Sequence, residues 1–72
     1  MNNLLTEREK NVVYYLTQGF TNVEIAKKLH ISVHTVKAHL EAIYEKLEVY
    51  NRVQAVTKSI LLGLVDLGSL VK

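Results

Sequence analysis

The chain has 72 residues, 49% of them hydrophobic, with no cysteine and no proline. We expect one small domain over residues 1–72, because a chain of this size can fold around one core without a disulfide or a metal. The absence of cysteine excludes disulfides, thiolate metal sites and cysteine nucleophiles. The net charge of +2 is weak support for a nucleic-acid partner. No basic flank precedes an apolar run at the start of the chain, so we expect a cytoplasmic protein without a membrane segment.

Capping boxes predict where the first two helices begin. In this Ser/Thr-x-x-Glu pattern, each of the two side chains accepts a hydrogen bond from a backbone N–H that has no other partner in the first helical turn. Thr6 with Glu9 forms one such box, and Thr21 with Glu24 forms another. The first two helices should therefore start directly after Thr6 and Thr21.

Similar signals predict the remaining helix ends. Gly19 stops the first helix, where positive φ is common, and Gly63 stops or interrupts the fourth. Ser32 is a suitable cap for the third helix, and Asn51 with Gln54 for the fourth. The expected helices lie near residues 7–18, 22–29, 33–47 and 52–62.

Only His30 and Ile31 separate the second helix from the cap of the third. So short a connection makes two helices pack across each other, which is the helix-turn-helix arrangement. His30 suits this turn, because histidine tolerates positive φ better than most side chains. No stretch alternates apolar and polar residues for long enough to predict a strand. The expected fold is all-α, a four-helix helix-turn-helix domain.

The third helix has one apolar and one polar face at about 100° per residue. Its core stripe consists of Val33, Val36, Leu40, Ile43 and Leu47, with Tyr44 at the edge. Its opposite face consists of His34, Ala38, Glu41, Ala42 and Glu45, with Lys37 on one flank and Thr35, His39 and Lys46 on the other. The small residues Ala38 and Ala42 let the backbone approach a surface closely, as a helix in the major groove must.

The three histidines do not predict a metal site. His34 and His39 are five residues apart, whereas two ligands on one helix lie three or four apart on the same face. His30 and His34 have a suitable spacing but lie on either side of the helix cap. We therefore expect no metal and no cofactor, and the alternative for His30 and His34 is an ordinary surface position.

The sequence resembles the LuxR/GerE-type (LuxR/FixJ family) helix-turn-helix DNA-binding domain. The resemblance runs from Leu5 to about Leu62 and includes "LTERE", "GFTNVEIAKKL", "ISVHTVKAHL" and "KLEVYNRVQAV" in the order and spacing of the family. It implies a four-helix domain whose third helix enters the major groove of DNA and whose fourth helix commonly forms a two-fold dimer.

The resemblance also implies which residues contact DNA. Positions that read base edges match Lys37, Ala38 and Glu41, and His34 lies at the leading end of the same face. Positions that contact phosphate match Thr35, His39 and Lys46 in the third helix and Thr21 and Asn22 at the start of the second. The start of a helix carries a partial positive charge that favours phosphate at these last two residues.

Two residues depart from the family pattern. Glu41 stands where a basic or amide residue is frequent, and its carboxylate could either accept a hydrogen bond from cytosine N4 or repel phosphate. Glu48 stands where glycine usually follows "KL". A positive φ at Glu48 would cost about 1 kcal/mol.

The fourth helix is apolar on more than one side. Val53, Val56 and Ile60 form one stripe, and Leu61 and Leu62 lie off it. Either the C-terminal tail (Leu64, Val65, Leu67 and Leu70) covers these two leucines or they form a dimer interface. The candidate dimer residues are Gln54, Lys58, Leu61 and Leu62, and the four tyrosines (Tyr14, Tyr15, Tyr44 and Tyr50) should fill the margin of the core.

We therefore predict sequence-specific binding of double-stranded DNA by a bacterial transcriptional regulator, either free-standing or as the output domain of a response regulator. It should act in the cytoplasm on the nucleoid, as a homodimer, with RNA polymerase as a further candidate partner. The alternatives are a helical protein-interaction module that keeps this fold and a DNA-binding domain like a sigma-factor region. No phosphate loop and no set of nucleophile and base supports an enzyme.

Overall fold

The computed structural model describes residues 5–65 and contains four helices, with no strand in that range. They are α1 (Glu7–Thr17), α2 (Asn22–Leu29), α3 (Val33–Leu47) and α4 (Arg52–Leu61). The predicted all-α, four-helix fold is confirmed. The predicted ends of the first and fourth helices are one residue too late, because Gln18 and Leu62 are the residues that cap α1 and α4.

All four predicted N-terminal caps are present. The Thr6 hydroxyl accepts a hydrogen bond from the Glu9 N–H (3.1 Å), and the Glu9 carboxylate accepts one from the Thr6 N–H (2.9 Å). Thr21 and Glu24 form the same reciprocal pair at 3.1 and 2.8 Å. Ser32 accepts from the Thr35 N–H at 3.0 Å, and Asn51 accepts from the Gln54 N–H at 2.9 Å.

Within residues 5–65, two residues other than glycine have left-handed backbone conformations, and each one ends a helix. His30 (φ 58°, ψ 44°) ends α2, which confirms the prediction of positive φ in the turn. Glu48 (φ 60°, ψ 48°) ends α3 in the position where the family usually has glycine. A side chain in this conformation costs about 1 kcal/mol or more, so Glu48 is a site of local strain.

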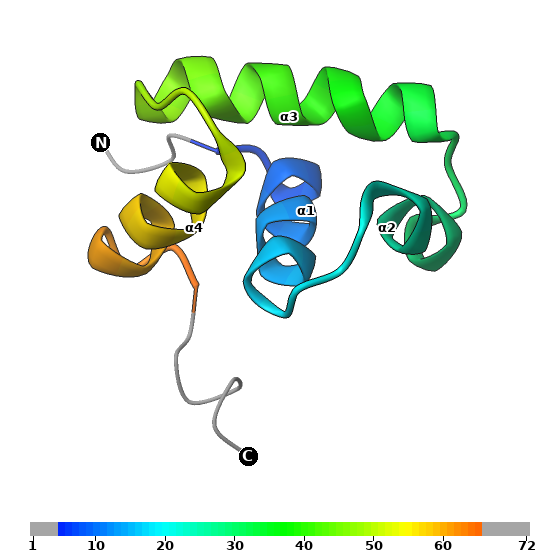
Figure 1. Ribbon diagram of the computed structural model, residues 1–72, viewed down its shortest axis with the longest axis horizontal. Helices are drawn as coiled ribbons and strands as arrows, with labels where there is room; N and C mark the ends of the chain where they lie inside the picture. Colours follow the sequence, from blue (N-terminus) through cyan, green and yellow to red (C-terminus); the bar gives the residue numbers. More distant parts are fainter. Residues whose placement is uncertain (1–4, 66–72) are drawn as a thin grey trace.

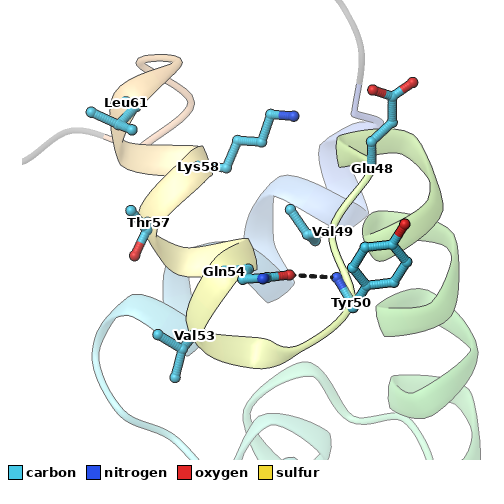
Figure 2. Close-up of a pocket in the computed structure, with 8 residues that line it drawn as sticks. All are labelled: Glu48, Val49, Tyr50, Val53, Gln54, Thr57, Lys58 and Leu61. Carbon is cyan, nitrogen blue, oxygen red and sulfur yellow. Dashed lines mark hydrogen bonds between the residues drawn. The ribbon is translucent and has the colours of Figure 1, made fainter.

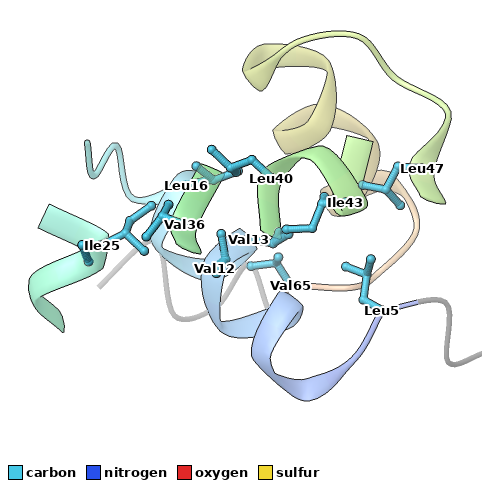
Figure 3. Close-up of a cluster of buried hydrophobic side chains, with 11 residues drawn as sticks. Leu5, Val12, Val13, Leu16, Ile25, Val36, Leu40, Ile43, Leu47 and Val65 are labelled. Carbon is cyan, nitrogen blue, oxygen red and sulfur yellow. The ribbon is translucent and has the colours of Figure 1, made fainter. Parts of the chain in front are cut away.

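Figure 1 shows α3 running along one side of the domain, with α4, α1 and α2 arranged beneath it. The core lies between α3 and the other helices (Figure 3) and includes Val12, Val13, Leu16, Ile25, Val36, Leu40, Ile43 and Leu47. The predicted core stripe of the third helix is confirmed for the four of its residues in this list. Val33 and Tyr44 are half-buried at the margin. Most of the opposite side of α3 is therefore exposed.

Val53, the first residue of the apolar stripe of the fourth helix, is 74% exposed and lies outside the core. The residues of α4 that are fully buried are Ala55 and Ser59. Val56 and Ile60 are half-buried beside them. Small residues let α4 approach α1 and α3 closely, so this helix packs through the face with the smaller side chains.

Two further predictions about the core have different outcomes. Tyr50 is 89% exposed and does not fill the core margin, unlike the half-buried Tyr14, Tyr15 and Tyr44. Packing of the tail is confirmed for Val65, which is buried, and for Leu64, which packs against the core. Leu67 and Leu70 lie outside the described residues. Because Leu61 and Leu62 remain exposed, this part of the tail does not cover them.

Candidate nucleic-acid interface

The outward side of α3 carries the four residues predicted to read bases. His34, Lys37, Ala38 and Glu41 are all exposed. Their spacing of three and four residues makes them neighbours on one helix face. Since the opposite side of the helix is anchored in the core, this face is held in a fixed orientation by buried side chains.

Polar groups flank this face at the start of α3. The hydroxyl oxygens of Ser32 and Thr35 lie 2.9 Å apart, within hydrogen-bond distance, so the cap of α3 also holds the Thr35 side chain. Thr35 and His39 are half-buried and lie one helical turn apart. The structure thus places these two predicted phosphate contacts on one flank of the exposed face.

The start of α2 forms a second polar region. Its capping box uses the N–H groups of Thr21 and Glu24, which leaves those of Asn22 and Val23 without a helical partner, as at any helix start. The carbonyl oxygen of the Asn22 side chain (Oδ1) accepts a hydrogen bond of 2.7 Å from Nη2 of Arg52, the first residue of α4. Arg52 therefore belongs to this region although it is 30 residues away in the sequence.

Lys46, another predicted phosphate contact, forms an ion pair within the protein. Its Nζ donates a 2.7 Å hydrogen bond to the Glu9 carboxylate, and the side chains are 36% and 7% exposed, respectively. Burial raises the pKa of Glu9, but hydrogen bonds from Lys46 and from the Thr6 backbone outweigh it and hold this pKa below its usual value. Lys46 thus joins the end of α3 to the start of α1.

The sequence did not predict the partners of Glu9 and Arg52, which are Lys46 and Asn22. Glu9 had a complete local explanation as a capping residue, and Arg52 counted only as a general positive charge. The one available signal was that a glutamate on the buried side of the first helix needs a cation. Neither partner could be identified from spacing.

The outward side of α4 carries a shallow apolar groove (Figure 2). Its lining consists of Glu48, Val49, Tyr50, Val53, Gln54, Thr57, Lys58 and Leu61. Three of the four predicted dimer residues are among them, and Leu62 is exposed outside the lining. The Tyr50 N–H donates a 2.8 Å hydrogen bond to the Gln54 side chain, which fixes the loop before α4. Tyr50, which was expected at the margin of the core, and Val53 are additional apolar residues of this groove.

Other kinds of site find no support within residues 5–65. No group of three or more histidine, aspartate and glutamate side chains in this range is placed to hold a metal ion. None of the four described helices is long and apolar enough to cross a membrane.

Residues 3–59 match the family described as bacterial regulatory proteins, luxR family (GerE). The response regulator VraR of Staphylococcus aureus (strain NCTC 8325 / PS 47) is 47% identical over 53 residues, which cover 74% of this chain and 25% of VraR. VraR of Staphylococcus epidermidis (strain ATCC 35984) shows the same identity and coverage. This chain thus spans about a quarter of the length of the curated relatives it matches.

Two solved structures of bacterial regulators also match this chain. The transcription factor GerE superposes with a TM-score of 0.85 and 33% identity, covering 92% of this chain and 98% of GerE. The response regulator ChrA of a heme-sensing two-component system gives a TM-score of 0.82 and 45% identity, covering 83% of this chain and 30% of ChrA. With its four helices and its match over residues 3–59, this chain belongs to the LuxR (GerE) family of bacterial regulatory proteins and is a helix-turn-helix domain of that family.

Proposed function

We propose that this domain binds double-stranded DNA sequence-specifically, with α3 in the major groove, and that it serves a bacterial transcriptional regulator. The supporting observation is the exposed polar face of α3, whose opposite side is fixed in the core. The regulator is either free-standing or a response regulator with this domain as its output, and it acts on the nucleoid in the cytoplasm. RNA polymerase is the second partner we propose for it.

The chemistry of the α3 face suggests a role for each residue. Lys37 can donate to guanine O6 and N7, and Glu41 can accept from cytosine N4. Ala38 can contact a thymine methyl group and lets the backbone come close. His34, at the leading end of the face, can donate or accept through its ring nitrogens.

Phosphate contacts would hold this face in register on the duplex. We assign them to Thr35 and His39, on one flank of the face, and to Thr21 and Asn22 at the start of α2. Lys46 remains a candidate, because an ammonium group has three donors and only one is used by Glu9.

Selection from a pool of random duplexes, followed by anisotropy titrations, tests this proposal. Lys37→Ala is expected to weaken binding to the selected site by about tenfold or more and to relax the preference at one base pair. Lys10→Ala is the matched control, because Lys10 lies on α1 and pairs with Glu7. Absence of any selected sequence and of salt-dependent binding would refute the function. Equal weakening of all sequences by Lys37→Ala and Glu41→Ala would remove both residues from base reading.

We also propose that two copies pair through α4 on DNA. Tyr50, Val53 and Leu61 expose large apolar surfaces on this helix and the loop before it, and Gln54 and Lys58 add polar groups beside them. A two-fold pairing would bring the groove against its own copy.

Sedimentation with a selected duplex measures this pairing. Leu61→Ser is expected to reduce the two-copy complex, whereas Asn11→Ser, at an exposed position of α1, should leave it intact. One copy per duplex for the unaltered protein would refute the dimer without touching the proposal of DNA binding.

A further inference from the structure

Arg52 joins the first turn of α4 to the first turn of α2. Its side chain is half-buried, and Nη2 donates to Asn22 Oδ1 over 2.7 Å. The two residues line one hollow at the start of α2, together with Gly19, Phe20, Thr21 and Val23. The contact therefore lies at the predicted phosphate-binding region rather than in the core.

The chemistry of this hydrogen bond determines which end of the Asn22 amide faces outward. A guanidinium group has donors only, so it can be bonded only by the carbonyl end of the amide. The other end, Nδ2, makes no hydrogen bond within residues 5–65, and it is not among the buried polar atoms without partners. Nδ2 is thus presented to solvent. Phosphate oxygens only accept hydrogen bonds, so this donor end is the one that a DNA backbone can use.

The guanidinium group of Arg52 has both a stabilising and a destabilising contact. Nη2 is bonded to Asn22, whereas Nη1 is buried and has no hydrogen-bond partner among the described residues. A buried donor without a partner opposes folding, so it offsets part of what the hydrogen bond to Asn22 contributes. A role in orienting Asn22 for a ligand would account for a guanidinium at this position.

We propose that Arg52 is a positioning residue, which holds the Asn22 amide so that its NH₂ group donates to a DNA phosphate. This inference rests on the proposed DNA binding and adds an indirect role for α4 in it. Because Nη1 is buried and Nη2 is bonded to Asn22, we assign the phosphate contact to Asn22 and an indirect role to Arg52.

A double-mutant cycle on DNA affinity tests this role, with Arg52→Met, Asn22→Ala and the combined variant. Arg52→Met is expected to weaken binding about tenfold alone, as loss of one hydrogen bond to a charged group does. In the Asn22→Ala background the same change should have almost no effect. The slope of log affinity against log salt should stay the same, whereas a direct phosphate contact would reduce its magnitude by about 0.9. Arg52→Lys keeps a donor and is expected to restore part of the affinity.

Two measurements on the free protein separate this role from a loss of folding. Thermal unfolding of Arg52→Met should occur at about the same temperature, because removal of the unpartnered Nη1 offsets the loss of the hydrogen bond to Asn22. Nitrogen relaxation by NMR should show an ordered Asn22 side-chain amide in the unaltered protein and a mobile one in Arg52→Met.

The outcomes distinguish the two proposals. Unaltered protein that binds no duplex would overturn the proposed function and the role of Arg52 in it. An equal loss of affinity in both backgrounds, a reduced salt slope or an Asn22 amide that is no more ordered than in Arg52→Met would overturn the role of Arg52 alone.

Discussion

Lys46→Met is expected to destabilise the domain by about 2 kcal/mol. Methionine keeps most of the stem but leaves the Glu9 carboxylate, 7% exposed, without its cation. Removing one partner of a fully buried ion pair costs about 3–5 kcal/mol. The value here should be lower, because the Lys46 side chain is 36% exposed and Glu9 keeps its hydrogen bond from the Thr6 N–H. In a domain of this size, 2 kcal/mol lowers the melting temperature by about 10 °C.

Urea unfolding followed by circular dichroism at pH 7 measures this free energy. Lys10→Met is the matched control, because Lys10 Nζ lies 3.7 Å from the exposed Glu7 carboxylate, and loss of such a surface pair should cost less than about 0.5 kcal/mol. Adding Glu9→Gln to Lys46→Met removes the buried charge and should recover most of the loss, since the amide oxygen can still accept from Thr6. If Lys46→Met were no more destabilising than Lys10→Met, the ion pair would not hold the domain together as argued.

Three further predictions concern stability. Because the pKa of Glu9 is held below its ordinary value of 4.5, its contribution is present above that pH and lost as the pH falls through the lower value. As the pH is lowered, the free energy of unfolding should therefore decrease more steeply for the unaltered protein than for Glu9→Gln. Glu48→Gly should add about 1 kcal/mol by relieving the left-handed conformation, and an unchanged urea midpoint would contradict the strain. Ser59→Ala should add about 1 kcal/mol, because the buried hydroxyl has no described partner. A lower melting temperature for Ser59→Ala would show instead that the Ser59 hydroxyl makes a hydrogen bond in the folded protein.

The helices could be predicted from the sequence because their signals are local. Each cap joins residues three apart, so Thr6, Thr21, Ser32 and Asn51 determine a helix start wherever the chain folds. The side of the fourth helix that is buried depends instead on the shape of its neighbours. The large apolar Val53 is exposed, whereas close packing buries the smaller Ala55 and Ser59 on another side of the helix.

The candidate site also has one part that the sequence predicts and another part that it does not. The outward face of α3 is the complement of its core stripe, so periodicity predicted it correctly as an exposed surface. The two contacts that brace the site join residues 37 and 30 positions apart, Lys46 with Glu9 and Arg52 with Asn22. No pattern along the chain links such partners, because many pairs of opposite or complementary groups occur at similar separations.

These two contacts act on different parts of the same rigid unit. His30 in its left-handed conformation and the short turn fix α2 against α3, so the start of α2 and the base-reading face move together. Phosphate contacts set the register in which a recognition helix meets the bases. In the proposed complex, a shift of α3 after loss of Lys46 would displace Lys37 and Glu41 from the base pairs we propose for them, and loss of Arg52 would weaken the phosphate contact of Asn22 that sets the register. The proposed preference among DNA sequences would therefore also depend on Arg52 and Lys46, which are not proposed to touch a base.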